Sequence, residues 1–369
     1  MDLRTHIRYG KKNIWRSKDV EIHPILHNEV VDMRCISCGK DGTASILSFC
    51  ADCIREKQIS LEEVHERVRS SMRLPGKPPK SPDGIRCNLC SNECILGKGE
   101  RSYCGLRKNI NGEMVSRVSS EVALAYAYLD PLPTNCCAAW FCPGSSEVGY
   151  NLAVFFYGCN FDCLFCQNDS HKDIDGAPKM KMSEFVERVK SNEEIRCICY
   201  FGGSPEPQLP FALKASEEVL KERDIRICWE WNGCGDPKLV EKAAELSFKS
   251  GGIVKFDLKA FDPNMSIALS GVLNERAYKN FEMIGDRYKE VITATTLLVP
   301  NYVDWKEVEK IAKFIADIDP EIPYSLLVFH PAFYMSDMPI TPRKQVEECY
   351  KTARRYLNKV NIGNKHLLL

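Results

Sequence analysis

Residues 157–168 read YGCNFDCLFCQN and directly follow an apolar run at 152–157 that has the composition of a buried strand. Cys159, Cys163 and Cys166 therefore share one short loop with the spacing Cys-x3-Cys-x2-Cys. Three thiolates on such a loop can bind three irons of a 4Fe–4S cluster and leave the fourth iron open to a reactant. A three-cysteine zinc loop and a ferredoxin fragment are the alternatives.

Strands and amphipathic helices alternate from residue 151 onward. The predicted strands are 152–157, 195–201, 225–229, 253–258, 291–299 and 324–329, and the predicted helices are 182–191, 210–222, 237–249, 275–288, 304–318 and 342–357. This alternation predicts an α/β fold with a parallel sheet covered by helices. Six units are too few for a complete eight-fold barrel. We therefore expect a partial (β/α)6 barrel with its active site at the carboxyl ends of the strands.

The composition is ordinary for a globular protein except for its cysteines. The chain has 369 residues, and its 50 basic and 50 acidic residues give a formal net charge of zero. Bulk charge therefore does not favour nucleic acid, and the apolar runs are too short for a secretory signal or a membrane span. We expect a cytosolic protein. Its 19 cysteines then indicate metal sites rather than disulfides.

Two groups of four cysteines precede the predicted barrel. The first group is Cys35, Cys38, Cys50 and Cys53, and the second is Cys87, Cys90, Cys94 and Cys104. Four thiolates predict structural zinc or mononuclear iron at one or both groups, with a second 4Fe–4S cluster as the alternative. We expect a zinc-ribbon-like subdomain at 1–75, a second Cys-rich segment with an entrance loop at 76–150, and the barrel at 151–369. Within the first, a capping box at 60–63 predicts a helix beginning at Ser60.

The remaining cysteines have less specific patterns. Cys136, Cys137 and Cys142 lie in a Pro-rich segment just before the barrel, and they could line the active-site entrance, donate a hydrogen atom, act as ligands or be inert. Cys197, Cys199, Cys228 and Cys349 fit a buried core, because free cysteine is among the most buried residue types.

The cysteine loop resembles the signature of the radical S-adenosylmethionine (SAM) superfamily, in which an aromatic residue also precedes the last cysteine, as Phe165 does here. The resemblance implies that Cys159, Cys163 and Cys166 bind the cluster. It implies that SAM binds the open iron and is cleaved to a 5′-deoxyadenosyl radical, which abstracts a hydrogen atom.

Motifs at the ends of later strands agree with this resemblance. They imply SAM contacts from Gly202, Gly203 and Glu206, from Glu230 and Asn232, from Asp257 and Lys259, and from Tyr157, Phe165 and His330. The spacer between Gly203 and Glu206 departs from the simple Gly-Gly-Glu-Pro form, and the Asp257–Lys259 pair and His330 could instead be structural.

Residues 85–369 most resemble the pyruvate formate-lyase activating enzyme-like branch, found in archaea and anaerobes. The resemblance implies a peptide or protein substrate and a reductant such as ferredoxin or flavodoxin. One alternative is a cobalamin-dependent radical SAM methyltransferase acting on a protein residue. Another is an RNA-binding protein with four-cysteine knuckles, which the lack of aromatics interleaved with the basic residues disfavours.

Overall fold

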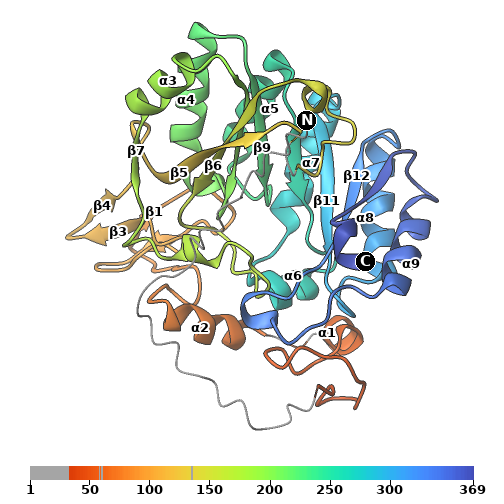
Figure 1. Cartoon of the computed structure of the whole chain (residues 1–369). Helices are drawn as coiled ribbons and strands as arrows, with labels where there is room; N and C mark the ends of the chain where they lie inside the picture. Colours follow the sequence, from red (N-terminus) through yellow and green to blue (C-terminus); the bar gives the residue numbers. More distant parts are fainter. Residues whose placement is uncertain (1–32, 58, 60, 134–135) are drawn as a thin grey trace, which may run out of the picture. The chain divides into compact units, whose positions relative to one another are not determined.

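The computed structural model describes residues 33–57, 59, 61–133 and 136–369 (Figure 1). Residues 1–32, which open the predicted N-terminal subdomain, and Ser60, the predicted helix start, lie outside the described residues. Met33–Leu369 forms one compact unit. The Cys-rich segments from residue 33 onward therefore pack together with the barrel, and the boundaries at 75 and 150 stay predictions.

A nine-stranded sheet organises the unit, in the order β13-β12-β11-β10-β9-β8-β6-β5-β7. Its parallel strands are β6 (Tyr150–Phe156), β8 (Ile195–Gly202), β9 (Arg226–Trp231), β10 (Val254–Asp257), β11 (Ile292–Leu298), β12 (Tyr324–Val328) and β13 (Val360–Gly363). The strands β5 (Val122–Pro131) and β7 (Lys179–Lys181) extend it as antiparallel neighbours at one edge. The predicted α/β class and six-unit parallel sheet are confirmed, while β5, β7 and β13 were not predicted.

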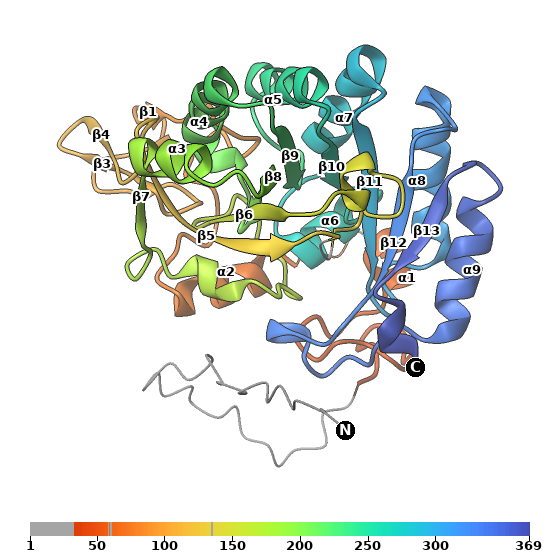
Figure 2. The same cartoon turned by 45° about the horizontal axis from the view of Figure 1, so that its top comes forward.

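Helices follow the parallel strands and line the outer side of the curved sheet (Figure 2). They are α3 (Met182–Lys190), α4 (Leu209–Glu222), α5 (Pro237–Ser250), α7 (Glu275–Tyr288), α8 (Trp305–Ile318) and α9 (Arg343–Ala353), all within a few residues of the predicted ranges. An unpredicted short helix, α6 (Pro263–Ser270), follows β10. Aspartate side chains cap α5 and α8, where Asp236 and Asp304 accept backbone N–H groups.

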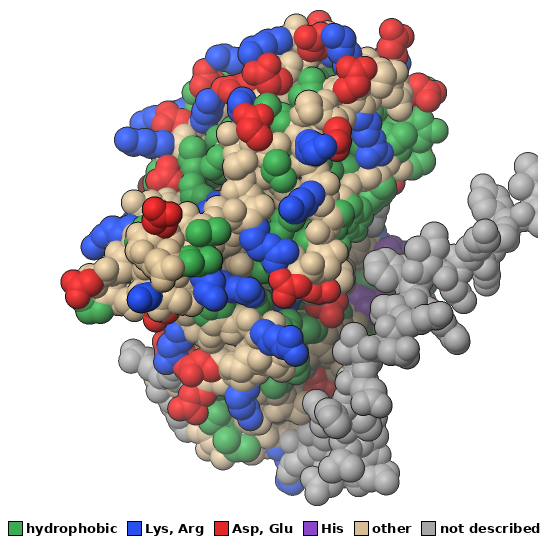
Figure 3. Space-filling view, turned by 90° about the vertical axis from the view of Figure 1, so that its left-hand side faces the viewer, with side chains coloured by type: hydrophobic (Ala, Val, Ile, Leu, Met, Phe, Trp, Pro, Cys, Tyr) green, Lys and Arg blue, Asp and Glu red, His purple; other side chains and the backbone are tan. Residues whose placement is uncertain are grey.

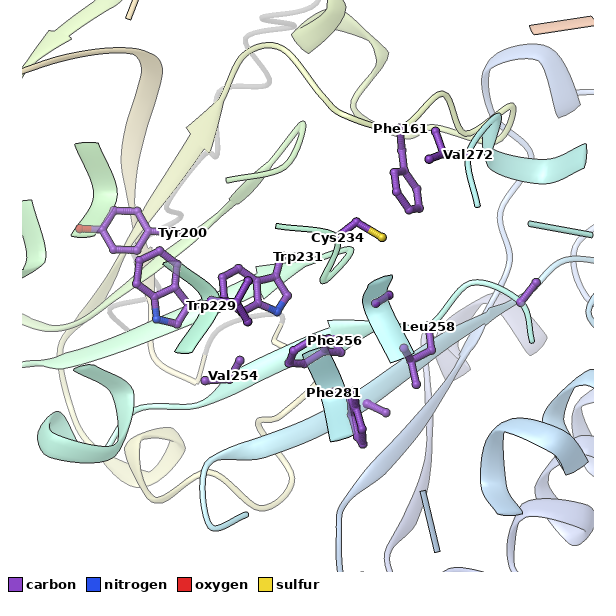
Figure 4. Close-up of a cluster of buried hydrophobic side chains, with 14 of the residues drawn as sticks. Phe161, Tyr200, Trp229, Trp231, Cys234, Val254, Phe256, Leu258, Val272 and Phe281 are labelled. Atoms are coloured by element: carbon purple, nitrogen blue, oxygen red, sulfur yellow. The ribbon is translucent and has the colours of Figure 1, made fainter. Parts of the chain in front are cut away.

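Alternation along the strands separates an apolar outer face from a polar inner face. In the core, the ring of Trp229 stacks on that of Trp231, and the rings of Trp231 and Phe256 meet edge to face (Figure 4). The intervening Glu230 pairs with Lys255 of the next strand. Ionisable groups on the inner face of a sheet need a reason, because burying charge is costly. The inner face is therefore where a functional site is expected.

The N-terminal elements pack against the ends of barrel strands. They are α1 (Ala51–Lys57), α2 (Glu62–Ser71), and the hairpins β1–β2 (Ile85–Arg86 and Ile95–Leu96) and β3–β4 (Arg107–Ile110 and Glu113–Ser116). From α1, Arg55 donates to Asp304 at 3.0 Å and to Glu307 at 3.0 Å at the start of α8. Basic and acidic side chains are interspersed on the face shown in Figure 3. Among the described helices, none combines the length and apolar character that a bilayer crossing requires.

Candidate active site and metal centres

The cysteine loop leaves β6 through a sharp turn at Gly158. Gly158 has φ 79°, and a Cβ there would lie 2.8 Å from the carbonyl oxygen of Cys104, so a larger residue would be both strained and obstructed. Downstream, the backbone N–H of Asp162 donates to the Ser270 carbonyl at 2.8 Å, and that of Leu164 donates to the Leu269 carbonyl at 3.0 Å. The C-terminal end of α6 therefore fixes the middle of the loop.

The three loop thiols lie farther apart than the ligands of a compact single-ion group. Among the described residues, groups of ligand atoms lying within 4.8 Å of one another occur at the first four-cysteine group and at Cys136, Cys137 and Glu230, and Cys159, Cys163 and Cys166 do not form one. In a 4Fe–4S cluster each cysteine binds a different iron, so wider separation is expected.

Burial controls the ionisation of these thiols. It raises the pKa of Cys166 to about 11, and it also raises the pKa values of Cys159 and Cys163. The cations Lys172 and Lys259 act in the opposite direction. Since a thiolate is the ligand form, the charge of bound iron is needed to complete the ionisation.

Asp162 anchors the loop from within. Its buried carboxylate accepts from His65 Nδ1 at 2.9 Å and from the Lys172 ammonium, and the Arg69 guanidinium lies at 3.6 Å. The hydrogen bond from His65 and the charges of Lys172 and Arg69 lower the pKa of Asp162 far below its ordinary value against the opposing effect of burial. His65 and Arg69 belong to α2, so the Cys-rich N-terminal region directly contacts and supports the cysteine loop.

The glycines predicted to meet SAM lie beside this loop. The thiol of Cys159 donates to the carbonyl of Gly203 at 3.1 Å. A Cβ on Gly203 would lie 2.8 Å from the Phe156 carbonyl oxygen, and Gly202 has φ 82°. The backbone can make these approaches only because neither residue has a side chain.

Asp257 and Lys259 also lie near the cluster loop. Lys259 pairs with Asp257 and lies 5.6 Å above the Phe165 ring. The second carboxylate oxygen of Asp257, Oδ1, is buried and has no hydrogen-bond partner within the described part of the chain. A buried acceptor without a donor is costly unless a ligand supplies one. The residues therefore fit a ligand that carries N–H or O–H groups.

Glu206 and Asn232 connect the ends of neighbouring strands. Glu206 is fully buried, accepts the Gly233 N–H at 2.8 Å and accepts the Ser204 hydroxyl. Asn232 donates to Ser204 at 2.9 Å and to Asn160 of the cysteine loop at 2.8 Å. Both side chains therefore already have protein partners, and their predicted roles toward SAM stay predictions.

The remaining predicted contacts occupy different surroundings. Phe165 is buried against Phe329, and Tyr157 packs on His171 at the end of β6. His330 is exposed and its Nδ1 lies 2.8 Å from the Pro331 carbonyl. Glu230 lies beside Cys136 and Cys137.

The two four-cysteine groups differ in geometry. The sulfurs of Cys35, Cys38, Cys50 and Cys53 gather within 4.8 Å of one another, as a single tetrahedral ion requires. Among the described residues, the cysteines of the second group do not form such a set, and burial followed by the charge of Cys104 raises the pKa of Cys90 well above its ordinary value. Zinc, mononuclear iron and a 4Fe–4S cluster all stay predictions for this group.

Sequence reasoning missed two features of the site. One is the anchoring of Asp162 by His65, a residue 97 positions away. The other is Lys255, which lies 2.9 Å from Glu230 and 3.0 Å from the sulfur of Cys136. The run Lys255-Phe-Asp257-Leu-Lys259 alternates charged with apolar residues, and this alternation is the signal that could have indicated an inward-facing Lys255.

Comparison with known proteins agrees with the fold and the loop. The model of the radical SAM superfamily matches residues 153–315, which include all three loop cysteines. Residues 153–315 therefore match the radical SAM superfamily, in agreement with the resemblance that the cysteine loop predicted.

Relatives with curated names occur in Methanocaldococcus jannaschii. One, whose name gives it as a candidate glycyl-radical enzyme activating enzyme, is 29% identical over 181 residues, which cover 47% of this chain and 66% of that protein, just under two thirds of its length. An uncharacterized protein of the same organism is 28% identical over 299 residues, covering 76% of this chain and 81% of that protein. Among solved structures, a domain of pyruvate-formate lyase-activating enzyme from Bacteroides vulgatus has 19% identity and a TM-score of 0.39, over 45% of this chain and 98% of that one.

Proposed function

We propose that the protein binds a 4Fe–4S cluster through Cys159, Cys163 and Cys166 and cleaves SAM reductively to abstract a hydrogen atom from a peptide or protein substrate. The observation that carries the proposal is the position of three cysteines on one loop at the end of β6, within the matched residues 153–315. When bound, the cluster would supply the electron and the open iron site.

The chain's own residues would orient and enclose the reactants. Gly202 and Gly203 permit backbone approach at the loop, and the unpartnered oxygen of Asp257 is available to a donor on the ligand. The ring of Phe165, buried against Phe329, would exclude water from the cluster side. Exclusion of water strengthens electrostatic interactions and protects a reactive radical.

The name of a relative supports the proposed substrate class. The matching relative of M. jannaschii is named for activating a glycyl-radical enzyme, and such a reaction acts on a protein backbone. We propose structural zinc at Cys35, Cys38, Cys50 and Cys53, an iron–sulfur cluster at Cys87, Cys90, Cys94 and Cys104, and a small reductant protein as partner.

The test is formation of 5′-deoxyadenosine by anaerobically reconstituted protein with dithionite. Cys159→Ala should abolish SAM cleavage, whereas Cys349→Ala, a buried cysteine in α9, should retain it. Cleavage at the wild-type rate by Cys159→Ala would refute the assignment. A corrinoid absorption band in the purified protein would instead indicate the methyltransferase alternative.

A further inference from the structure

A second group of reactive side chains lies on the inner face of the sheet. It comprises Cys136, Cys137, Glu230, Lys255 and Cys199. The two vicinal cysteines come from the loop between β5 and β6, which crosses to β12, where the hydroxyl of Ser325 donates to the Cys137 carbonyl at 3.0 Å. The other three, Cys199, Glu230 and Lys255, come from β8, β9 and β10, respectively.

Lys255 is the centre of this group. Its side chain is only 2% exposed, and its ammonium lies 3.0 Å from the sulfur of Cys136, 3.4 Å from that of Cys199 and 2.9 Å from a carboxylate oxygen of Glu230. A buried ammonium needs anionic or strongly accepting partners to remain charged. Glu230 supplies one negative charge, and the nearest sulfur, that of Cys136, is the group best placed to supply another.

The pKa values of the two vicinal thiols shift in opposite directions. A hydrogen bond with Cys137 and the charge of Lys255 lower the pKa of Cys136 to about 6 although burial opposes this, and the thiol of Cys137 also donates to a carboxylate oxygen of Glu230 at 3.9 Å. The same hydrogen bond and burial raise the pKa of Cys137 well above its ordinary value. Burial also raises the pKa of Cys199. The geometry agrees with these directions, because the Lys255 ammonium lies closer to the sulfur of Cys136, at 3.0 Å, than to that of Cys199, at 3.4 Å.

The group is open to a ligand. The Glu230 side chain, near the carboxyl end of β9, is 36% exposed, and Cys136 and Cys137 are both partly exposed. An ion-paired thiolate with an open side is a nucleophile, and thiolates prefer soft electrophiles.

We propose that Cys136 is a second reactive centre, a thiolate paired with Lys255 on the inner face of the sheet, which forms a covalent bond with a soft electrophilic carbon. The sulfur lone pair forms the S–C bond, and the leaving group departs with the electron pair of the bond that breaks. No proton is released, because the thiol is already ionised and Lys255 keeps its proton. This centre requires neither iron nor SAM, so it stands independently of the proposed function.

The test measures alkylation by iodoacetamide in the native, cluster-free protein under anaerobic reducing conditions. Peptide mapping by mass spectrometry reads each cysteine separately, and Cys142, on the same loop, reports loop opening. For a thiol of pKa about 6, the rate at pH 8 should exceed that at pH 6 only about twofold, whereas an ordinary thiol of pKa about 8.5 gives about 75-fold. The ratio is independent of how accessible the sulfur is.

Lys255→Met should raise the ratio of the Cys136 alkylation rates at pH 8 and pH 6 toward the value of an ordinary thiol. Lys255→Arg, which keeps the charge, should leave this ratio low. A wild-type ratio near 75-fold would overturn the proposal, as would absence of Cys136 labelling at every pH. Protection of Cys136 and Cys137 by a stoichiometric metal, released on denaturation, would also overturn it and identify a metal site with Glu230.

Discussion

Replacing Asp162 with asparagine should make local opening of the cysteine loop more frequent while leaving every cysteine unchanged. Asp162 is fully buried between His65, Lys172 and Arg69, so the substitution leaves two buried cations without their anion. Breaking a buried ion pair in this way costs about 3–5 kcal/mol. Since about 1.4 kcal/mol corresponds to a factor of ten, local opening should become about a hundredfold to several thousandfold more frequent.

Hydrogen exchange of the cluster-free protein provides the assay, because a chain of this size need not unfold in one step. The informative amides are those of Asp162 and Leu164, which donate to the carbonyls of Ser270 and Leu269. They should exchange faster in the variant, while β11 should be unchanged. The matched control is Asp175→Asn, which removes an exposed partner of Arg117. Exchange within threefold of wild type at 159–166 would refute the anchoring role.

Metal analysis should give about one zinc and about eight irons per reconstituted chain. The variant Cys50→Ser should lack the zinc, and the variant Cys94→Ser should contain about four fewer irons. Two zincs and four irons would show that the second four-cysteine group holds a single ion. Burial raises the pKa of Glu206 to about 7. Between about pH 4.3 and 7 the native state therefore keeps a proton that the unfolded chain has lost. The free energy of unfolding should consequently fall by about 3 kcal/mol as the pH rises from 4.5 to 7. Glu206→Gln should remove this loss of stability, and calorimetry of the wild type and the variant at pH 5 and 8 would detect the difference. The same dependence of stability on pH in both proteins would contradict the prediction. Arg55→Met should lower the free energy of unfolding by about 3 kcal/mol, because buried Glu307 loses its charge partner; Lys40→Met, at an exposed pair, is the control for thermal unfolding.

The sequence predicted the parallel units because their strands are nearly continuous apolar runs between periodic helices. The strand β13 has no such run, since its four residues are only half-buried, and β7 is three residues long with two exposed lysines. The antiparallel strand β5 precedes the repeating units, so the alternation carried no signal for it. Local spacing also found the loop cysteines and the first four-cysteine group.

Contacts between distant residues could not be read from local patterns. Cys136 meets Glu230 only because a long loop crosses the inner face of the sheet. Likewise, nothing in the surroundings of His65 in the sequence indicates that it faces Asp162. Burial decides the partners of such groups, and burial depends on the packing of whole elements rather than on spacing.

The anchoring of the cysteine loop gives the Cys-rich N-terminal region a role in the active site. Three separate elements hold the loop: α2 through Asp162, α6 through its last carbonyls, and the β1–β2 hairpin, where Asn92 donates to the Asn160 carbonyl at 2.7 Å. Two of these three precede the barrel in the chain. Since second-shell contacts orient the ligands of a metal site, we expect metal bound at the four-cysteine groups to stabilise the elements that position the loop thiols. Removal of the metal proposed at Cys35, Cys38, Cys50 and Cys53 should therefore also reduce iron loading at the cysteine loop, to which these residues contribute no ligand.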